Sequence, residues 1–476
     1  MNRLMVIVVS LALAVLAGCG AKRKGPVGDW QGKVATTAGD LTVVIHVTRG
    51  EDGKLAATLD SPDQGATGIP ASEVTFEQDK LTLEFAIIGG SYEGTIQPGD
   101  SIMFGPWTQG QSVLPLQMRR LSGKVPEVAR PQEPKKPYPY KEEEVTVVNQ
   151  EAGIELAGTL TLPDSGGPFP AAVLITGSGP EDRNEAIFGH KPFLVLADCL
   201  TRRGIAVLRC DDRGVGKSTG DYTSATTEDL ASDALVQVEY LKTRKEVDPA
   251  RIGLIGHSEG GIIAPIVANR TEDVAFVVLL AGTGLPGDSV LMLQTALIAR
   301  SNGATDSAVV EMTRLERRIL DIVMQNEDTA KAGAALRALF RESLAGMDER
   351  GKEALGFTEE SIDAQVSTVL TPWFRYFLRY DPRPALRALK APVLAIIGGK
   401  DLQVAPDVNL PAIKSVLEAG GNKDYTVREL PGLNHLFQHA ETGAVTEYAK
   451  IEETIAPEAL ELVGDWILEH TRTSGN

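Results

Sequence analysis

The sequence predicts an α/β fold in the long C-terminal part of the chain, preceded by a small antiparallel all-β domain. Three features lead to this prediction. Residues 26–121 alternate apolar and polar side chains between turn residues, residues 122–141 are rich in proline, and residues 142–476 alternate apolar strands with helices. Near-continuous runs of Val, Ile and Leu between helices are typical of a mostly parallel sheet with helices on both faces.

The composition excludes several classes of protein. At roughly 100–200 residues per domain, a chain of 476 residues is expected to hold two or three folded units. A net charge of −17 and an aromatic content of 5% argue against nucleic-acid binding, which needs a cationic face or aromatic stacking platforms. Three cysteines are too few for a disulfide scaffold or a Cys-rich zinc module.

The N-terminal residues have the pattern of a targeting segment. Arg3 precedes an apolar run of about 14 residues, which is too short to span a bilayer comfortably. The run ends in Leu16-Ala17-Gly18-Cys19, which resembles the bacterial lipobox. We expect residues 1–19 to be a lipoprotein signal peptide and Cys19 to be the site of lipidation, so that a lipid anchors the protein to a membrane. The alternative is an ordinary signal peptide in which Cys19 is incidental.

The expected location is the bacterial cell envelope, facing the periplasm or the exterior. Gly20 follows the cysteine, in place of the aspartate that often retains such proteins at the inner membrane. The outer membrane is therefore slightly favoured.

The first domain, at 26–121, is expected to be a small antiparallel barrel or sandwich, because its strands recur every 8–12 residues without helices. Turn sequences separate these strands. The prolines between 126 and 139 exclude a helix or a central strand, so residues 122–141 are expected to form a stiff linker. The clearest strands of the first domain lie at 41–47, 54–59 and 80–85.

The second domain, at 142–476, is expected to open with a hairpin and to continue as buried strands between helices. The region from about 285 to 385 has helical periodicity and no strand. It predicts a helical cap inserted at the C-terminal edge of the sheet, where lids cover ligand crevices. The hairpin strands are expected at 144–149 and 156–162, and the buried strands at 171–176, 204–209, 251–255, 276–280, 393–397 and 426–430.

The sequence RIGLIGHSEGG at 251–261 is the most informative motif. A predicted strand runs into Gly-x-Ser-x-Gly and then into a helix, which is the context of a nucleophile elbow at Ser258. The backbone N–H groups of Glu259 and of Ser178, in the loop after the first long buried strand, are the expected oxyanion-hole donors. We expect the Glu259 side chain to face solvent and His257 to point away from the serine.

A serine nucleophile needs a base and a carboxylate that orients the base. His435 lies in the loop after the predicted last strand, and His439 is its competitor. Asp401 follows the predicted strand at 393–397, whereas its competitor Asp407 follows a proline and is expected to cap a helix. The chain order Ser258, Asp401, His435 matches that of the α/β-hydrolases.

From about residue 142 to 469 the chain resembles the α/β-hydrolase superfamily. The sequences TGSGPEDRN at 176–184 and DDRGVGKS at 211–218 are similar to those of bacterial secreted esterases that carry an N-terminal β domain, and residues 28–120 resemble that domain. The resemblance implies carboxylic ester hydrolysis through an acyl-enzyme on Ser258. Peptidases related to prolyl oligopeptidase share this core, so peptide or amide cleavage remains an alternative.

The sequence GVGKS at 214–218 looks like the end of a phosphate-binding loop, but Asp211 stands where that motif opens with glycine. We expect Asp212 and Arg213 to form a structural ion pair there instead. No metal or cofactor is expected.

The sequence thus predicts a lipid-anchored serine carboxylesterase whose substrate is a small ester with a short to medium acyl group. A non-catalytic envelope lipoprotein whose β domain binds a ligand is the remaining alternative, and the intact Ser, Asp and His argue against it.

Overall fold

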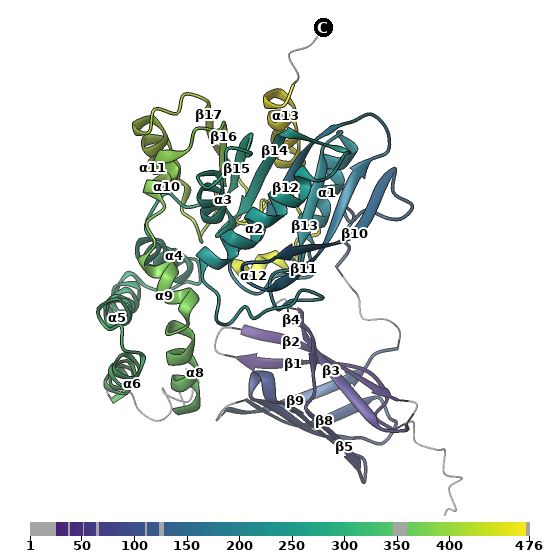
Figure 1. Ribbon diagram of the computed structural model, residues 1–476. Coiled ribbons are helices and arrows are strands. Elements are labelled where there is room, and N and C mark those ends of the chain that lie inside the picture. The colour runs from purple at the N-terminus through teal and green to yellow at the C-terminus, as the bar shows by residue number, and fades with distance from the viewer. Residues whose placement is uncertain are drawn as a thin grey trace, which may run out of the picture. The chain divides into compact units, whose positions relative to one another are not determined.

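The computed structural model describes residues 25–36, 39–50, 52–62, 66–109, 112–122, 128–345 and 359–472. They fall into two compact units, one built mostly from residues before Val125 and one mostly from residues after Pro126 (Figure 1). The expected signal peptide at 1–19, with Cys19, lies outside the described residues. Within the described ranges, none of the helices combines the length and the apolar character that crossing a bilayer requires.

The N-terminal unit is a nine-stranded sheet among the residues described, in the order β4-β3-β2-β1-β9-β8-β7-β6-β5. Strands β1 and β2, and β5 to β8 in succession, pair antiparallel, which confirms the predicted all-β domain. Burial alternates along β6, where Leu81, Leu83 and Phe85 are fully buried, so that one face forms the core. The strands are β1 (Gly28–Thr36), β2 (Gly39–Arg49), β3 (Leu55–Ser61), β4 (Ala66–Pro70), β5 (Glu73–Glu77), β6 (Lys80–Phe85), β7 (Gly90–Ile96), β8 (Ile102–Gln109) and β9 (Ser112–Arg120), with a 3-10 turn at Ala86–Ile88.

The C-terminal unit is built on an eight-stranded sheet in the order β10-β11-β13-β12-β14-β15-β16-β17. Its first two strands form the antiparallel hairpin, and from β13 to β17 all pairs are parallel. The expectation of a mostly parallel sheet is therefore confirmed. The strands are β10 (Tyr140–Asn149), β11 (Ile154–Pro163), β12 (Phe169–Ile175), β13 (Ala206–Cys210), β14 (Val247–His257), β15 (Phe276–Leu280), β16 (Val393–Gly398) and β17 (Tyr425–Leu430).

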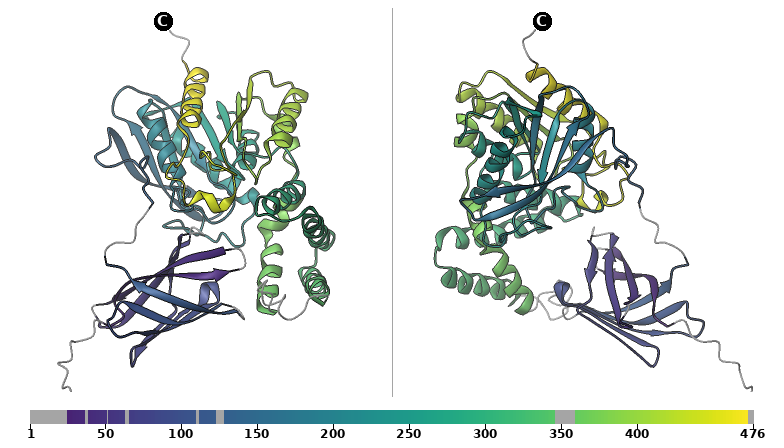
Figure 2. Two further views of the ribbon diagram at one scale, coloured as in Figure 1. Left: turned by 180° about the vertical axis from the view of Figure 1, so that it is seen from behind. Right: turned by 45° about the vertical axis from the view of Figure 1, so that its right-hand side comes forward.

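Helices cover both faces of this sheet (Figure 2). Because side chains alternate along a strand, Ala172 and Leu174 of β12 pack under one helix layer, and Ala171 and Val173 pack under the other. The first layer holds α1 (Pro192–Arg202) and α13 (Pro457–His470). The second holds α2 (Thr227–Lys242), α3 (Gly260–Ala268), α10 (Arg383–Ala388) and α11 (Pro406–Ala419), and a short helix α12 spans Val445–Tyr448.

Among the described residues, the segment between β15 and β16 is helical. Five helices of this segment precede α10. They share an apolar cluster of their own, which includes Leu320, Phe340 and Val366. Helix α4 approaches α9 so closely that a Cβ on Gly287 would lie 2.0 Å from the Phe377 carbonyl oxygen. These helices, which we call the cap, are α4 (Gly287–Ser301), α5 (Asp306–Gln325), α6 (Thr329–Ala345), α8 (Glu359–Val369) and α9 (Pro372–Arg379).

The described part of the proline-rich segment is hydrogen-bonded to the C-terminal unit through Arg130. The Arg130 guanidinium donates to the carbonyl oxygens of Phe188 at 3.1 Å, Gly189 at 3.0 Å and Ala449 at 2.9 Å, and also to that of Ile451. Guanidinium groups carry five donors in a rigid fork, so one arginine can join two loops in this way.

The expected ion pair between Asp212 and Arg213 is not formed. Arg213 Nε donates to Asp233 Oδ2 at 2.7 Å, and Nη2 donates to Oδ1 at 2.9 Å. Asp212 instead accepts the Thr176 hydroxyl and the Glu181 N–H, both at 3.0 Å. The prediction was wrong because neighbours in sequence on a tight loop point in different directions.

We expect Arg213→Met to lower the free energy of unfolding by about 3–5 kcal/mol, because it leaves the buried Asp233 carboxylate without its cation. Urea unfolding at pH 7 measures the change. The control is Arg314→Met, whose pair with Glu311 is 61% and 66% exposed; it should cost less than about 1 kcal/mol. A loss that small for Arg213→Met would contradict the assignment.

Candidate active site

Ser258 lies on a sharp turn between β14 and α3, with a left-handed φ of +53°. Its N–H donates to the Leu280 carbonyl oxygen at 2.8 Å, which holds this strained residue in place. The flanking glycines are required by close backbone contacts. A Cβ on Gly256 would lie 2.0 Å from the Gly260 carbonyl oxygen, and one on Gly260 would lie 2.2 Å from that of Ile175. The turn has the geometry of a nucleophile elbow.

His435 and Asp401 form a buried pair. His435 Nδ1 lies 2.8 Å from Asp401 Oδ2, and the two residues are 4% and 2% exposed. The other carboxylate oxygen of Asp401 accepts the N–H groups of Gln403 and Val404, each at 2.8 Å. Since a carboxylate accepts at Nδ1, the proton of neutral His435 is held there and Nε2 is left as the basic nitrogen.

Ser258 and His435 line the same cavity, which has a volume of about 250 Å³. The competing residues lie elsewhere. His439 is 57% exposed and pairs with Glu453 and Glu458. Asp407 lies in the first turn of α11, whose N-cap is Ala405 without a side-chain bond, so the expected cap role of Asp407 was wrong.

The backbone N–H groups of Ser178 and Glu259, both at the cavity, have no acceptor among the residues described. The neighbours of Ser178 are both engaged. Gly177 N–H donates to Glu185 Oε1 at 2.8 Å, and Gly179 N–H donates to the Tyr222 hydroxyl at 2.9 Å. The loop is thus fixed on either side of Ser178, as expected for a preorganised oxyanion-hole donor.

The Glu259 side chain is buried and does not face solvent as the sequence led us to expect. It is 2% exposed, accepts the Thr227 hydroxyl at 2.7 Å, and accepts Trp373 Nε1 of the cap at 2.8 and 2.9 Å. Burial raises the pKa of this carboxyl above its usual range. The motif around Ser258 holds no signal for these contacts, because Trp373 lies 114 residues further along the chain.

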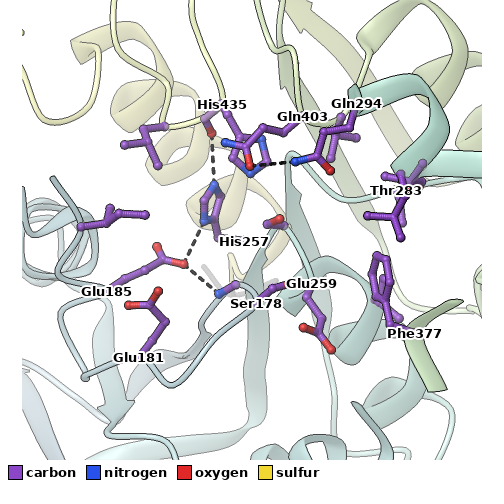
Figure 3. A pocket seen from close by; sticks show the side chains of 18 of the residues that line it. Ser178, Glu181, Glu185, His257, Glu259, Thr283, Gln294, Phe377, Gln403 and His435 are labelled. Carbon is purple, nitrogen blue, oxygen red and sulfur yellow. Dashed lines mark hydrogen bonds and ion pairs between the residues drawn. The ribbon is translucent and has the colours of Figure 1, made fainter. Parts of the chain in front are cut away.

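His257 also lines the cavity, although the sequence led us to expect that it points away from the serine. Its Nδ1 lies 2.8 Å from Glu185 Oε1 and its Nε2 lies 3.1 Å from the His435 carbonyl oxygen (Figure 3). Burial alone would lower the pKa of His257, but the charge and the hydrogen bond of Glu185 raise it to about 9.

The cavity has an acidic side and an apolar side. Figure 3 shows Glu181 and Glu185 on one side of the site and Phe377 on the other. Burial, with the charges of Glu185 and Asp182, raises the pKa of Glu181 to about 7. Helix α3 and the cap contribute the apolar lining residues Ile262, Val290, Leu291, Trp373 and Phe377, and loops contribute Ile187, Val404 and Leu436. In the described part of the chain, no group of three or more His, Cys, Asp and Glu side chains is arranged to hold a metal ion.

Known proteins match this chain in sequence and in fold. A sequence profile described as "Alpha/beta hydrolase family" matches residues 172–447. Esterase EstD of Thermotoga maritima is 27% identical over 315 residues; the match covers 66% of this chain and 64%, less than two thirds, of that relative. An uncharacterized protein of Mycobacterium tuberculosis is 32% identical over 139 residues, which are 29% of this chain and 46% of that protein. A solved esterase of Pyrococcus furiosus is 15% identical with a TM-score of 0.42, over 73% of this chain and 98% of that one.

Proposed function

The chain belongs to the alpha/beta hydrolase family, and from this premise we propose that it is a serine carboxylesterase acting through an acyl-enzyme on Ser258. The proposal rests on the lining of one cavity. Ser258 on its strained turn and His435 of the buried His–Asp pair both line it. The backbone N–H groups of Ser178 and Glu259, which have no acceptors among the described residues, lie at the same cavity. These are the parts that acyl transfer by serine requires.

In the first half-reaction, the Ser258 hydroxyl attacks the ester carbonyl carbon while His435 Nε2 takes the hydroxyl proton. Asp401 stabilises the imidazolium through the 2.8 Å bond at Nδ1. The N–H groups of Ser178 and Glu259 stabilise the negative charge that develops on the carbonyl oxygen. The imidazolium then returns the proton to the alcohol as the ester bond breaks. Water, activated by His435, releases the acid in the second half-reaction.

The cavity favours a substrate with a short to medium acyl group. Its volume of about 250 Å³ is at or below the lower end of the roughly 300–1,000 Å³ typical of small-molecule sites. We place the acyl group against Val290, Leu291 and Phe377, because these apolar side chains of the cap line that side. The alcohol then faces the acidic side.

Hydrolysis of p-nitrophenyl esters from acetate to palmitate tests the proposal, using protein that begins at residue 20. We expect kcat/KM to peak at short or medium chains and to fall by about tenfold or more at palmitate, because a long chain outgrows the apolar side. Uniform rates along the series would contradict the assigned acyl site. The absence of hydrolysis at every length would contradict the esterase function.

Amide cleavage is the second candidate, and the position of Glu181 favours it. No described residue donates a hydrogen bond to this carboxyl group, and it lines the cavity beside the loop of Ser178. Such a group can pair with the α-amine of an aminoacyl substrate. An aminoacyl p-nitroanilide assayed beside p-nitrophenyl acetate separates the two functions. If the anilide is preferred, and Glu181→Gln removes that preference alone, the protein is a peptidase.

A further inference from the structure

A buried histidine and a buried glutamate line the cavity beside the proposed catalytic residues. His257, the last residue of β14, is 7% exposed, and Glu185, in the loop after β12, is 3% exposed. The His257 ring is also close to that of His435, with 4.9 Å between the ring centroids. Neither residue has a step in the reaction described above.

The hydrogen bonds, together with the raised pKa of His257, indicate the protonation state of this pair. The His435 carbonyl oxygen only accepts, so His257 Nε2 carries a proton. Glu185 Oε1 accepts the Gly177 N–H and lies 2.8 Å from His257 Nδ1, and this contact raises the pKa of His257, so we infer that Nδ1 is the donor there as well. An imidazole with two N–H groups is cationic, and the pair is therefore an imidazolium and a carboxylate.

The pair joins two segments that acyl transfer must hold at a set distance. Glu185 fixes the N–H of Gly177, next to the donor at Ser178. His257 fixes the carbonyl of His435 itself. We propose that the Glu185–His257 ion pair is a positioning device that sets the oxyanion-hole loop relative to the catalytic histidine. This inference rests on the proposed function and extends it to two residues that do not touch the reacting atoms.

Deprotonation of His257 removes one of its two hydrogen bonds, because a neutral imidazole has one N–H for two acceptors. The titratable groups around His257 are Glu181 and Glu185 of the loop after β12, Asp401 after β16, and His435 after β17. The backbone N–H of His435 donates to the side chain of Tyr448. Since the pKa of His257 is raised to about 9, both hydrogen bonds persist through neutral pH and one is lost above about 9. We expect kcat/KM to fall on that alkaline side.

The test is Glu185→Gln in the full-length protein, assayed with p-nitrophenyl acetate from pH 6 to 10. The amide keeps an oxygen for the Gly177 N–H but removes the charge that holds His257 protonated. We expect the alkaline limb of kcat/KM to move down by one pH unit or more, toward the ordinary histidine value of about 6.5. At pH 8, kcat should fall about 10- to 100-fold with little change in KM, because misplaced catalytic groups slow the chemical step.

Two further variants keep the test decisive. The Asn side chain of His257→Asn is shorter than histidine and carries both N–H groups on one nitrogen, so it does not span the two acceptors at any pH. This variant should lower kcat and abolish the alkaline limb near pH 9. His439→Gln is the matched control, since that histidine also has a hydrogen-bond acceptor at each ring nitrogen, the carboxylates of Glu453 and Glu458, but is 57% exposed. Its profile should equal that of the wild type. A Glu185→Gln variant that loses thermal stability but keeps the wild-type alkaline limb would overturn the inference.

A readout without substrate separates this inference from the esterase proposal. In protein labelled with ¹⁵N-histidine, we expect a ring with both nitrogens protonated at pH 8 whose signals His257→Asn removes. A neutral ring at that position would overturn the ion pair whatever the activity. If the doubly protonated ring is present but no ester is hydrolysed and no fluorophosphonate labels Ser258, the esterase proposal fails, and the positioning role fails with it.

Discussion

Ser258→Ala is expected to lower kcat/KM for p-nitrophenyl esters by at least about 10⁴-fold. Removing the hydroxyl removes the nucleophile, and the backbone N–H groups of Ser178 and Glu259 remain to polarise the carbonyl without an attacking group. Such donors and substrate binding alone leave only residual catalysis in serine hydrolases. Steady-state rates with p-nitrophenyl acetate at pH 8 measure the loss. Activity within tenfold of the wild type would contradict the assignment of the nucleophile.

The fold should survive this change, because alanine keeps the Cβ atom and the left-handed φ of +53° at this position. The free energy of unfolding should stay within about 0.5 kcal/mol of the wild type. Ser258→Gly should be equally inactive but more stable by about 1 kcal/mol, since glycine adopts this backbone conformation without strain. Ser165→Ala, at an exposed serine in the turn before β12, is the matched control and should retain full activity.

Asp401→Asn is expected to lower kcat by about 10⁴-fold with little change in stability. The amide oxygen can still accept the N–H groups of Gln403 and Val404, so the local fold is kept. The amide nitrogen would then face His435 Nδ1 as a donor. This geometry stabilises the histidine tautomer with its proton on Nε2, which cannot accept the proton of Ser258.

The matched control for this change is Asp407→Asn, because Asp407 is an exposed carboxylate nearby in sequence and lies in the first turn of α11. It should leave kcat unchanged. If Asp401→Asn retained more than about a tenth of the wild-type kcat, another carboxylate would have to orient His435. A reciprocal loss in Asp407→Asn would identify it.

The fold class was predictable because strands and helices have local sequence patterns. Apolar runs such as that of β15 and glycine-flanked turns such as that of Ser258 depend on residues adjacent in the chain. The candidate residues Ser258, Asp401 and His435 were selected because each follows the C-terminal end of a strand. In a parallel sheet these ends meet at one edge, which is why the chosen Asp and His lie 2.8 Å apart.

The contacts that the sequence did not predict all join residues far apart in the chain. Asp233 lies 20 residues from Arg213, Glu185 lies 72 residues from His257, and Trp373 lies 114 residues from Glu259. No local pattern distinguishes a buried glutamate that has such partners from one that faces solvent. Burial of charged groups depends on the assembled core.

Local sequence is enough to predict the order of elements, the strained turn at Ser258 and the residues at the ends of strands, because backbone sterics and apolar periodicity act over a few residues. The burial of Glu259 against Trp373 of the cap, and the pairing of His257 with Glu185 as a cation, depend on the assembled fold. The reason is electrostatic: the charge of a buried group depends on its desolvation and on neighbours within a few ångströms, and folding alone brings those neighbours together.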